Sequence, residues 1–151
     1  MKIPGSTIIV TGASAGIGAA TARELSARGA NLLLTGRNTD ALAALEGELA
    51  GSLAVPADLT DPAAAARIAD AAISRFGRID ALVNNAGQGL HVPVEGIDPE
   101  AFRTIFDLNV IAPLRMMQAV IPTMRAQGGG AIVNISSGTT TVVPAGFAAY
   151  A

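Results

Sequence analysis

The chain of 151 residues is long enough for one domain and too short for two of ordinary size. Half of its residues are hydrophobic and only 3% are aromatic, so the core must be built from small and aliphatic side chains, and disorder is excluded. The formal net charge of −2 provides no basic field for nucleic acid or an anionic membrane. The absence of cysteine excludes disulfides and thiolate metal sites, and Lys2 is the only lysine.

The N-terminus shows no signal peptide, because it carries one charged side chain and reaches a turn signal at Pro4-Gly5. The apolar run Ile8–Val10 ends at Thr11-Gly12, far short of the roughly 20 residues of a membrane span. We therefore expect a soluble, cytoplasmic protein.

Short apolar runs alternate along the chain with longer, alanine-rich stretches. The runs are nearly continuous in apolar residues, which is typical of strands buried on both faces of a parallel sheet. The expected strands are Thr7–Val10, Asn31–Thr35, Leu53–Val55, Ala81–Asn84 and Ala131–Ile135. The expected helices are Gly16–Arg28, Thr39–Leu49, Pro62–Phe76 and Pro99–Arg125. This alternation predicts an α/β, doubly wound parallel sheet with right-handed crossovers.

The ends of the expected helices carry capping signals. Asp61 before Pro62, and Asp98 before Pro99, fit an N-cap followed by a proline in the first helical position. The C-cap candidates are Gly29, Gly77 and Gly128. Ligands of a doubly wound sheet bind beyond the carboxyl ends of the strands, so functional residues are expected just after each strand.

A glycine-rich turn, TGASAGIG from Thr11 to Gly18, follows the first strand and opens a helix. Gly12 permits the tight turn, Gly16 lets the backbone approach a pyrophosphate, and Gly18 lets helix and strand pack closely. The helix N-terminus offers N–H groups and a positive dipole end to phosphates, and Ser14 can add a hydroxyl donor. The alternative is a glycine-rich turn that binds no ligand.

The spacing T-G-x-x-x-G-x-G resembles the classical short-chain dehydrogenase/reductase (SDR) family. Further matches follow in register from Thr11 to Tyr150: Asp58-Leu59, Asn84-Asn85-Ala86-Gly87, Asn109, Asn134-Ile135-Ser136-Ser137 and Tyr150 itself. The resemblance implies one Rossmann-type domain over residues 1–151 with strand order 3-2-1-4-5 in three α/β/α layers. It also implies an NAD(P)-dependent oxidoreductase that acts on a carbonyl or secondary alcohol and forms homodimers or homotetramers.

The resemblance assigns cofactor binding to residues after the first four strands: Gly12, Ser14, Ala15, Gly16, Ile17, Gly18, Arg37, Asp58, Leu59, Asn85, Ala86 and Gly87. Arg37 after Gly36 supplies a cation where a ribose 2′-phosphate would lie, which favours NADP(H). Family members often have a second basic residue where this chain has Ala15, so NAD(H) remains the alternative. Arg37 could instead be a solvated residue ahead of a helix.

Other residues after the strands have two readings. Asp58 can accept a hydrogen bond from the adenine amine, with Leu59 beside the ring, or it can cap a local turn. Asn84 is expected to brace the sheet in part. His91, the only histidine, has no metal-binding neighbour and is expected to be a solvated or capping side chain. No metal site is expected.

By resemblance, Tyr150 is the catalytic acid/base, Ser137 is the catalytic serine thirteen residues earlier, and Asn109 belongs to a proton relay. Ser136 competes with Ser137 but is expected to face the sheet interior or the cofactor. The family's Tyr-x-x-x-Lys motif would place a lysine at position 154, beyond Ala151. We expect the 151 residues to be part of a longer polypeptide, the alternative being a genuine truncation.

The leading hypothesis is therefore hydride transfer between NADP(H), or NAD(H), and a carbonyl or secondary alcohol. The rivals are a dinucleotide-binding protein without turnover and an interaction scaffold that uses the apolar helix 99–125. The strand 131–135 is expected to be an exposed apolar edge. The loops Gly89–Val94 and Gly138–Phe147 would line the substrate entrance, and their uncharged character disfavours a substrate recognised through a carboxylate or phosphate.

Overall fold

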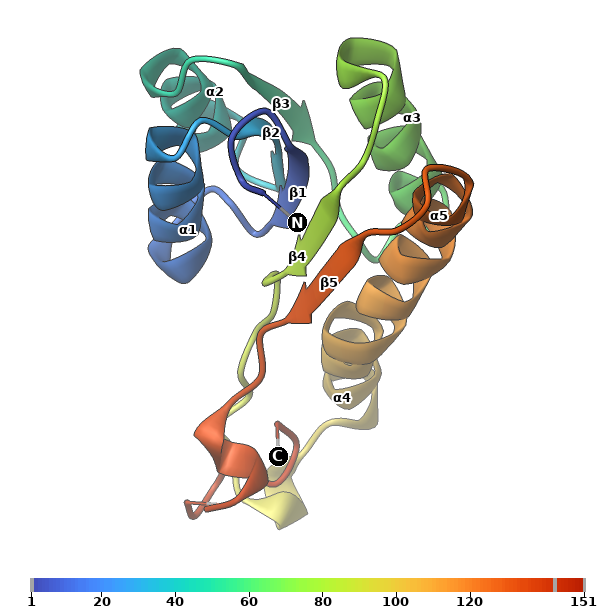
Figure 1. The fold of residues 1–151 in the computed structure, drawn as a ribbon. Coiled ribbons are helices and arrows are strands. Elements are labelled where there is room, and N and C mark those ends of the chain that lie inside the picture. The colour runs from blue at the N-terminus through green and yellow to red at the C-terminus, as the bar shows by residue number, and fades with distance from the viewer. Residues whose placement is uncertain (1, 143, 151) are drawn as a thin grey trace.

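The computed structural model describes residues 2–142 and 144–150, and within them five parallel strands form one sheet (Figure 1). The strands are β1 (Thr7–Thr11), β2 (Asn31–Gly36), β3 (Ser52–Pro56), β4 (Ala81–Asn84) and β5 (Ala131–Asn134). Their order, β3-β2-β1-β4-β5, confirms the predicted topology. The switch in direction lies between β1 and β4, where ligands of such sheets bind.

Helices cover both faces of the sheet (Figure 1). The helices α1 (Gly16–Ala27) and α2 (Thr39–Glu48) lie on one face. The other face carries α3 (Ala64–Phe76) and α5 (Ala112–Ala126), and α4 (Pro99–Phe106) lies beyond the carboxyl ends of β4 and β5 (Figure 1). Alternate strand residues therefore belong to two cores: Ile8 and Val10 pack with α1 and α2, whereas Ile9 packs with α3 and α5.

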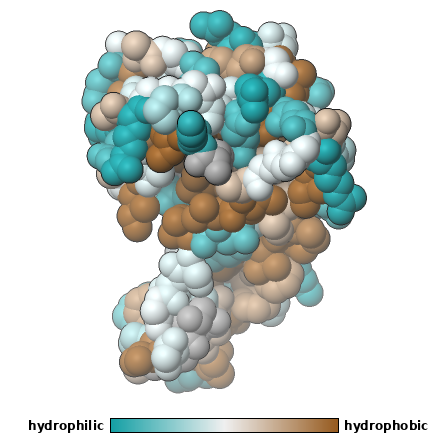
Figure 2. All heavy atoms as spheres, in the orientation of Figure 1, coloured by the Kyte–Doolittle hydropathy of each residue, from teal (hydrophilic) through white to brown (hydrophobic). Residues whose placement is uncertain are grey.

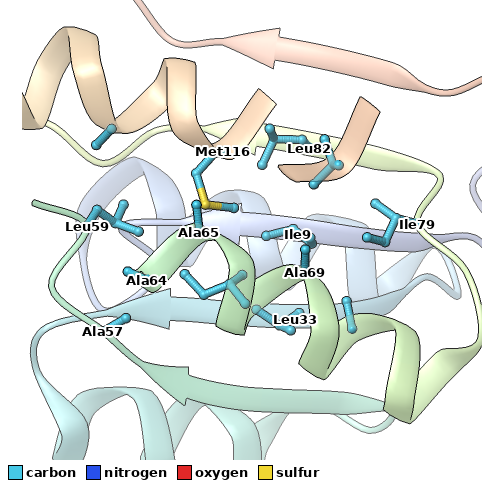
Figure 3. Packing of buried hydrophobic residues seen from close by; sticks show 14 of the residues in the cluster. Ile9, Leu33, Ala57, Leu59, Ala64, Ala65, Ala69, Ile79, Leu82 and Met116 are labelled. Carbon is cyan, nitrogen blue, oxygen red and sulfur yellow. The ribbon is translucent and has the colours of Figure 1, made fainter. Parts of the chain in front are cut away.

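The core between the sheet and α3 is built from small and aliphatic side chains, as the composition predicts. Met116 points from α5 toward α3 and the strands, where Ala65, Ala69 and Leu82 lie nearby (Figure 3). Alanines on the inner face of α3 let the helix approach the sheet closely, and the thioether of Met116 fills the remaining irregular space.

The expected helix 99–125 is present but is not uniformly α-helical. A π-helical turn, Asp107–Ile111, separates α4 from α5. Pro113 has no N–H to donate to the carbonyl of Asn109 four residues earlier, which explains why the α-helical pattern breaks here. Such π turns are frequently found at functional sites.

The capping signals are confirmed with one exception. Asp98 accepts hydrogen bonds from the N–H groups of Ala101 (3.1 Å) and Glu100 (3.4 Å), and Gly29, Gly77 and Gly128 have positive φ angles after their helices. The prediction that Asp61 caps a helix beginning at Pro62 was wrong, since α3 begins at Ala64. Asp61 instead accepts from the Ala63 N–H (2.9 Å) in a local turn ahead of the helix.

Strand β5 forms an edge of the sheet among the described residues, as predicted. The side chains of Val133 (48% exposed) and Ile135 (43% exposed) lie on it and just after it. Beyond β5 the chain leaves the sheet and packs against the loop after β4. The described residues of 88–97 and 138–150 form a projection that we call the C-terminal lobe, with a hydrophobic band between it and the sheet on this face (Figure 2).

Candidate functional site

The glycine turn after β1 has the geometry that the sequence predicts. Gly12 has φ +65°, and a Cβ at Gly18 would lie 2.6 Å from the Asn85 amide nitrogen, so only glycine fits. Gly16 has φ +54° and open space around its missing Cβ, which allows a ligand to approach the backbone. The α1 N-terminus has Ala15 as its N-cap, with no side-chain capping bond and no acidic residue in the first turn. Its N–H groups are therefore suited to an anion.

Asn85 and Thr11 hold the turn against the end of β4. The Asn85 amide nitrogen donates to the carbonyls of Thr11 (2.9 Å) and Gly12 (3.3 Å). The Thr11 hydroxyl accepts from the N–H groups of Asn85 (2.9 Å) and Ala86 (3.0 Å) and donates to the Val83 carbonyl (3.3 Å). The segment assigned to cofactor contact is thus also the brace of the glycine turn, which the sequence analysis did not anticipate.

A cleft of about 410 Å³ lies between the glycine turn and the carboxyl ends of β2 and β3. It brings together most of the predicted cofactor residues: Gly12, Ser14, Ala15, Gly16, Arg37, Asp58, Leu59, Asn85, Ala86 and Gly87. Gly18 is buried beneath the turn, and Ile17 lines a second cavity instead. A Cβ at Gly36 would lie 3.3 Å from the Ser14 hydroxyl, so this glycine keeps the cleft open beside Arg37.

Arg37 and Asp58 give the cleft one positive and one negative group. Asp58 Oδ1 accepts from the Thr60 N–H (2.9 Å) and hydroxyl (2.8 Å), so the local-turn reading of Asp58 describes this oxygen correctly. These two bonds hold the pKa of Asp58 below its ordinary value, and the Arg37 charge acts in the same direction. Asp58 is therefore an ionised acceptor at the cleft wall at neutral pH. Leu59 is 7% exposed and belongs to the core as well as to the cleft.

A second cavity of about 610 Å³ shares Asn85, Ala86 and Gly87 with the first. Its lining includes all the residues predicted to be catalytic, namely Ser137, Tyr150 and Asn109, together with Ser136. Residues from five separate parts of the chain, Ile17 included, thus meet beyond the carboxyl ends of β4 and β5. Ser136 lines this cavity and is exposed, so of the two expected orientations the structure excludes the sheet interior and leaves the cofactor side.

The π turn directs Asn109 toward the loop after β4. Asn109 Oδ1 accepts from the Gln88 N–H (3.0 Å), and its Nδ2 donates to the Gln88 carbonyl (2.9 Å). A Cβ at Gly87 would lie 3.3 Å from the same Oδ1, so the chain passes close to this amide. In this structure the Asn109 side chain fixes the loop, in addition to lining the cavity.

Two interactions near the second cavity involve partners that were not predicted, although Asn84 was expected to brace the sheet in part. The Asn84 amide donates to the Asn134 side-chain oxygen at 2.9 Å, which joins the carboxyl ends of β4 and β5. The His91 ring stacks on Phe147 with centroids 4.7 Å apart. His91 is solvent-exposed, as predicted, but it also contacts the segment that carries Tyr150. No spacing signal marked either pair, since their members lie about fifty residues apart.

Comparison with known proteins agrees with this geometry. The family model for short chain dehydrogenases matches residues 6–151. An uncharacterized oxidoreductase of Staphylococcus epidermidis is 36% identical over 137 residues, covering 90% of this chain and 60% of that protein. A 1-deoxy-11-beta-hydroxypentalenate dehydrogenase of Streptomyces avermitilis is 37% identical, covering 100% of this chain and 58% of that protein. A crystal structure of a metagenomic short-chain oxidoreductase in complex with NADP has a TM-score of 0.92 at 37% identity, covering 99% of this chain and 70% of that chain. The chain thus spans about 60% of the length of these two curated relatives.

Proposed function

Because the chain belongs to the short chain dehydrogenase family, we propose that it binds NADP(H) and is the cofactor-binding part of an oxidoreductase acting on a carbonyl or secondary alcohol. The observation that carries the proposal is the cleft that joins the uncapped, glycine-rich N-terminus of α1 to Arg37. The family and the dehydrogenase names of its relatives favour this function over a dinucleotide-binding protein without turnover.

Different residues of the cleft would bind different parts of the dinucleotide. The α1 N-terminus, with Gly16, would receive the pyrophosphate, because its N–H groups and dipole favour an anion. Arg37 would bind a ribose 2′-phosphate through its planar donor fork, which supports NADP(H) over NAD(H). Asp58 would accept from the adenine amine, for which its ionised carboxylate is suited. When bound, the cofactor supplies or accepts the hydride.

The second cavity would hold the substrate. Tyr150 would exchange the proton at the substrate oxygen, Ser137 would orient that oxygen, and Asn109 would support the proton path. The described residues that line this cavity include no Asp, Glu, Lys or Arg, and Ile17, Val110 and Ile135 supply apolar surface. This lining supports an uncharged carbonyl or alcohol substrate.

We also propose a homo-oligomeric, cytoplasmic protein. Phe102, Phe106, Val110 and Leu114 recur every four residues along α4, the π turn and α5, each between 41% and 46% exposed, and they form what we call the apolar stripe. A second copy covering the stripe would remove it from water.

The helix Pro99–Ala126 is also long and apolar enough to span a membrane by length and composition. Its buried residues, among them Met116 and Val120, pack in the core beside the sheet, which supports a soluble protein.

The decisive experiment is a titration of the 151-residue chain with NADPH and NADH, followed by nicotinamide fluorescence. The parent chain should bind NADPH more tightly than NADH. Arg37→Ala should weaken NADPH binding about tenfold or more, with little effect on NADH, because only NADPH carries the 2′-phosphate. Arg125→Ala, at an exposed position in the last turn of α5, is the matched control and should change neither affinity. Absence of binding of either dinucleotide would overturn the proposal.

A further inference from the structure

Three aromatic rings in the C-terminal lobe, those of His91, Phe147 and Tyr150, contact one another in succession. The His91 and Phe147 rings are stacked at 4.7 Å with an interplanar angle of 28°, and Phe147 meets Tyr150 edge-on at 6.4 Å and 61°. His91 Nε2 lies 3.2 Å from the Ala145 carbonyl oxygen. A carbonyl can only accept, so Nε2 carries a hydrogen and donates it. The single histidine thus contacts two residues of the segment that ends at Tyr150.

The backbone next to the three rings leaves space for the His91 imidazole. The Val92 N–H donates to the Gly146 carbonyl at 2.7 Å, which ties the two segments of the lobe together. Gly146 has φ +82°, and a Cβ there would lie 2.6 Å from His91 Cδ2, so both the conformation and the ring require glycine. The Tyr150 N–H donates to the Phe147 carbonyl at 2.9 Å, which fixes the tyrosine relative to the stacked ring.

These contacts matter because the segment that carries Tyr150 has little regular secondary structure among the described residues. After β5 the described chain forms only one short 3-10 turn, Gly138–Thr140, before residue 150. A surface segment without regular structure keeps its conformational freedom unless side-chain contacts restrict it. Pro144 and Ala145 are exposed, whereas Ala149 is buried, so the contacts with His91 and Val92 restrict the exposed start of this segment.

We propose that His91 is a positioning residue, which orders residues 144–150 and so keeps the Tyr150 side chain at the second cavity. The inference rests on the proposed function, in which Tyr150 exchanges a proton with the substrate. His91 itself acts through Phe147 and Ala145 and does not line the cavity. The stacking contributes orientation, and the Nε2 bond adds a directional tie to the backbone.

The amino-acid composition allows the mobility of Tyr150 to be measured directly by fluorescence. The chain has one tyrosine and no tryptophan, so its tyrosine fluorescence reports on Tyr150 alone. In the 151-residue chain, His91→Ala should lower the steady-state anisotropy of this fluorescence and raise the acrylamide quenching constant at least about twofold, because the segment is released. Phe147→Ala should reproduce both changes. The unfolding midpoint by far-UV circular dichroism should stay at the parent value, since His91 lies outside both cores.

Conservative variants separate positioning from a general structural role. His91→Phe keeps a ring for stacking and should restore most of the parent anisotropy, whereas His91→Gln keeps only a donor and should not. Val94→Ala, on the same loop and 67% exposed, is the matched control and should leave the signal unchanged. Parent-like anisotropy in His91→Ala, or a loss in His91→Phe as large as in His91→Ala, would contradict the proposal.

A cofactor titration on the same samples keeps the two proposals distinguishable. His91→Ala should bind NADPH as the parent does, because His91 does not line the cleft beside the glycine turn. If the parent chain itself fails to bind NADPH, the proposed function falls, but the fluorescence comparison still decides whether His91 orders the Tyr150 segment.

Discussion

Gly18, in the first turn of α1, lies directly against the carbonyl of Gly12, so that a Cβ on Gly18 would overlap the carbonyl oxygen. The same Cβ would lie 2.6 Å from the Asn85 amide nitrogen, which its hydrogen bonds to the Thr11 and Gly12 carbonyls hold in place. We therefore predict that Gly18→Ala destabilises the chain by about 1–3 kcal/mol through overpacking. It should also weaken NADPH binding, because the glycine turn must move. Urea unfolding and the NADPH titration measure the two effects.

Gly47→Ala is the matched control for this substitution. Gly47 lies inside α2, is exposed, and has no atom within 4 Å of the added Cβ. Alanine in place of an unconstrained helical glycine should stabilise the chain by about 0.5–1 kcal/mol. A Gly18→Ala chain as stable as Gly47→Ala would show that the turn tolerates a side chain at position 18.

Asn85 offers a second test, because its role depends on donating hydrogen bonds. Asn85→Ala loses the bonds to the Thr11 and Gly12 carbonyls and should cost about 1–3 kcal/mol of unfolding free energy. Asn85→Asp should be worse than Asn85→Ala, because a carboxylate would face those two carbonyl oxygens. The contrast is measured by urea unfolding at pH 7.

Asn38 is the matched control for Asn85, because its side chain accepts a hydrogen bond where that of Asn85 donates. Its side-chain oxygen accepts from the Ala41 N–H at the start of α2 (3.0 Å), a role that aspartate performs equally well. Asn38→Asp should therefore change stability by less than about 0.5 kcal/mol. Equal stabilities for Asn85→Asp and Asn85→Ala would contradict the donor role of Asn85.

The carboxylate of Asp80 should make the unfolding free energy of the chain depend on pH. Its carboxylate, 12% exposed, accepts two bonds from Arg78 (2.7 and 2.6 Å) and one from the Thr7 N–H (2.9 Å). The Arg78 bonds, foremost, hold the pKa of Asp80 below its ordinary value in the folded chain. Because the pKa of Asp80 is lower in the folded than in the unfolded chain, its ionised form contributes to the unfolding free energy. This contribution is fully present above the unfolded pKa of about 3.9, and it is lost as the pH falls through the folded pKa.

Asp80→Asn should therefore be less stable than the parent by about 1–3 kcal/mol at pH 7, because asparagine has one acceptor oxygen instead of two and no negative charge for Arg78. The difference should shrink below about pH 4, as the parent carboxylate is protonated. Urea unfolding between pH 7 and pH 3 measures it. Asp70→Asn, at an exposed position of α3, should stay within about 0.5 kcal/mol of the parent at every pH. A pH-independent Asp80 effect would argue against this linkage.

The strands and most helix ends could be predicted from the sequence because their signals are local. Continuous apolar runs marked the strands, and the glycines after α1, α3 and α5 marked their ends. The start of α3 was misplaced by two residues because Asp61 and Pro62 form a turn that uses the same residue types as an N-cap. The π turn was not predicted, since it depends on Pro113 together with the pairing of Asn109 and Gln88, which are distant in sequence.

The candidate site shows the same division. The family spacing predicted Ser137, Tyr150 and Asn109 as catalytic candidates, and the structure brings them to one cavity. The Asn84–Asn134 bond and the His91–Phe147 stack could not be predicted, because each joins two segments whose approach is decided by the sheet and the lobe rather than by local sequence.

The apolar stripe is a candidate contact between two copies of the chain. Phe106 is 46% exposed, with its ring 6.4 Å from that of Phe102, on a helix face directed away from the core. If the stripe is the contact between two copies, Phe106→Glu should shift the chain to the monomer, because burying the new carboxylate without a partner is costly. Sedimentation velocity over a range of concentrations measures the shift, with Ser74→Glu, at an exposed position of α3, as control.

The exposed edge of β5 could also cause association, by pairing with a strand of another copy. Val133→Lys distinguishes the two routes: it should reduce edge pairing but leave a stripe-mediated dimer intact. Monomer formation by Phe106→Glu, with persistence of the dimer in Val133→Lys, would assign the interface to the stripe. The reverse pattern would assign the association to the sheet edge and remove the stripe as an interface between copies.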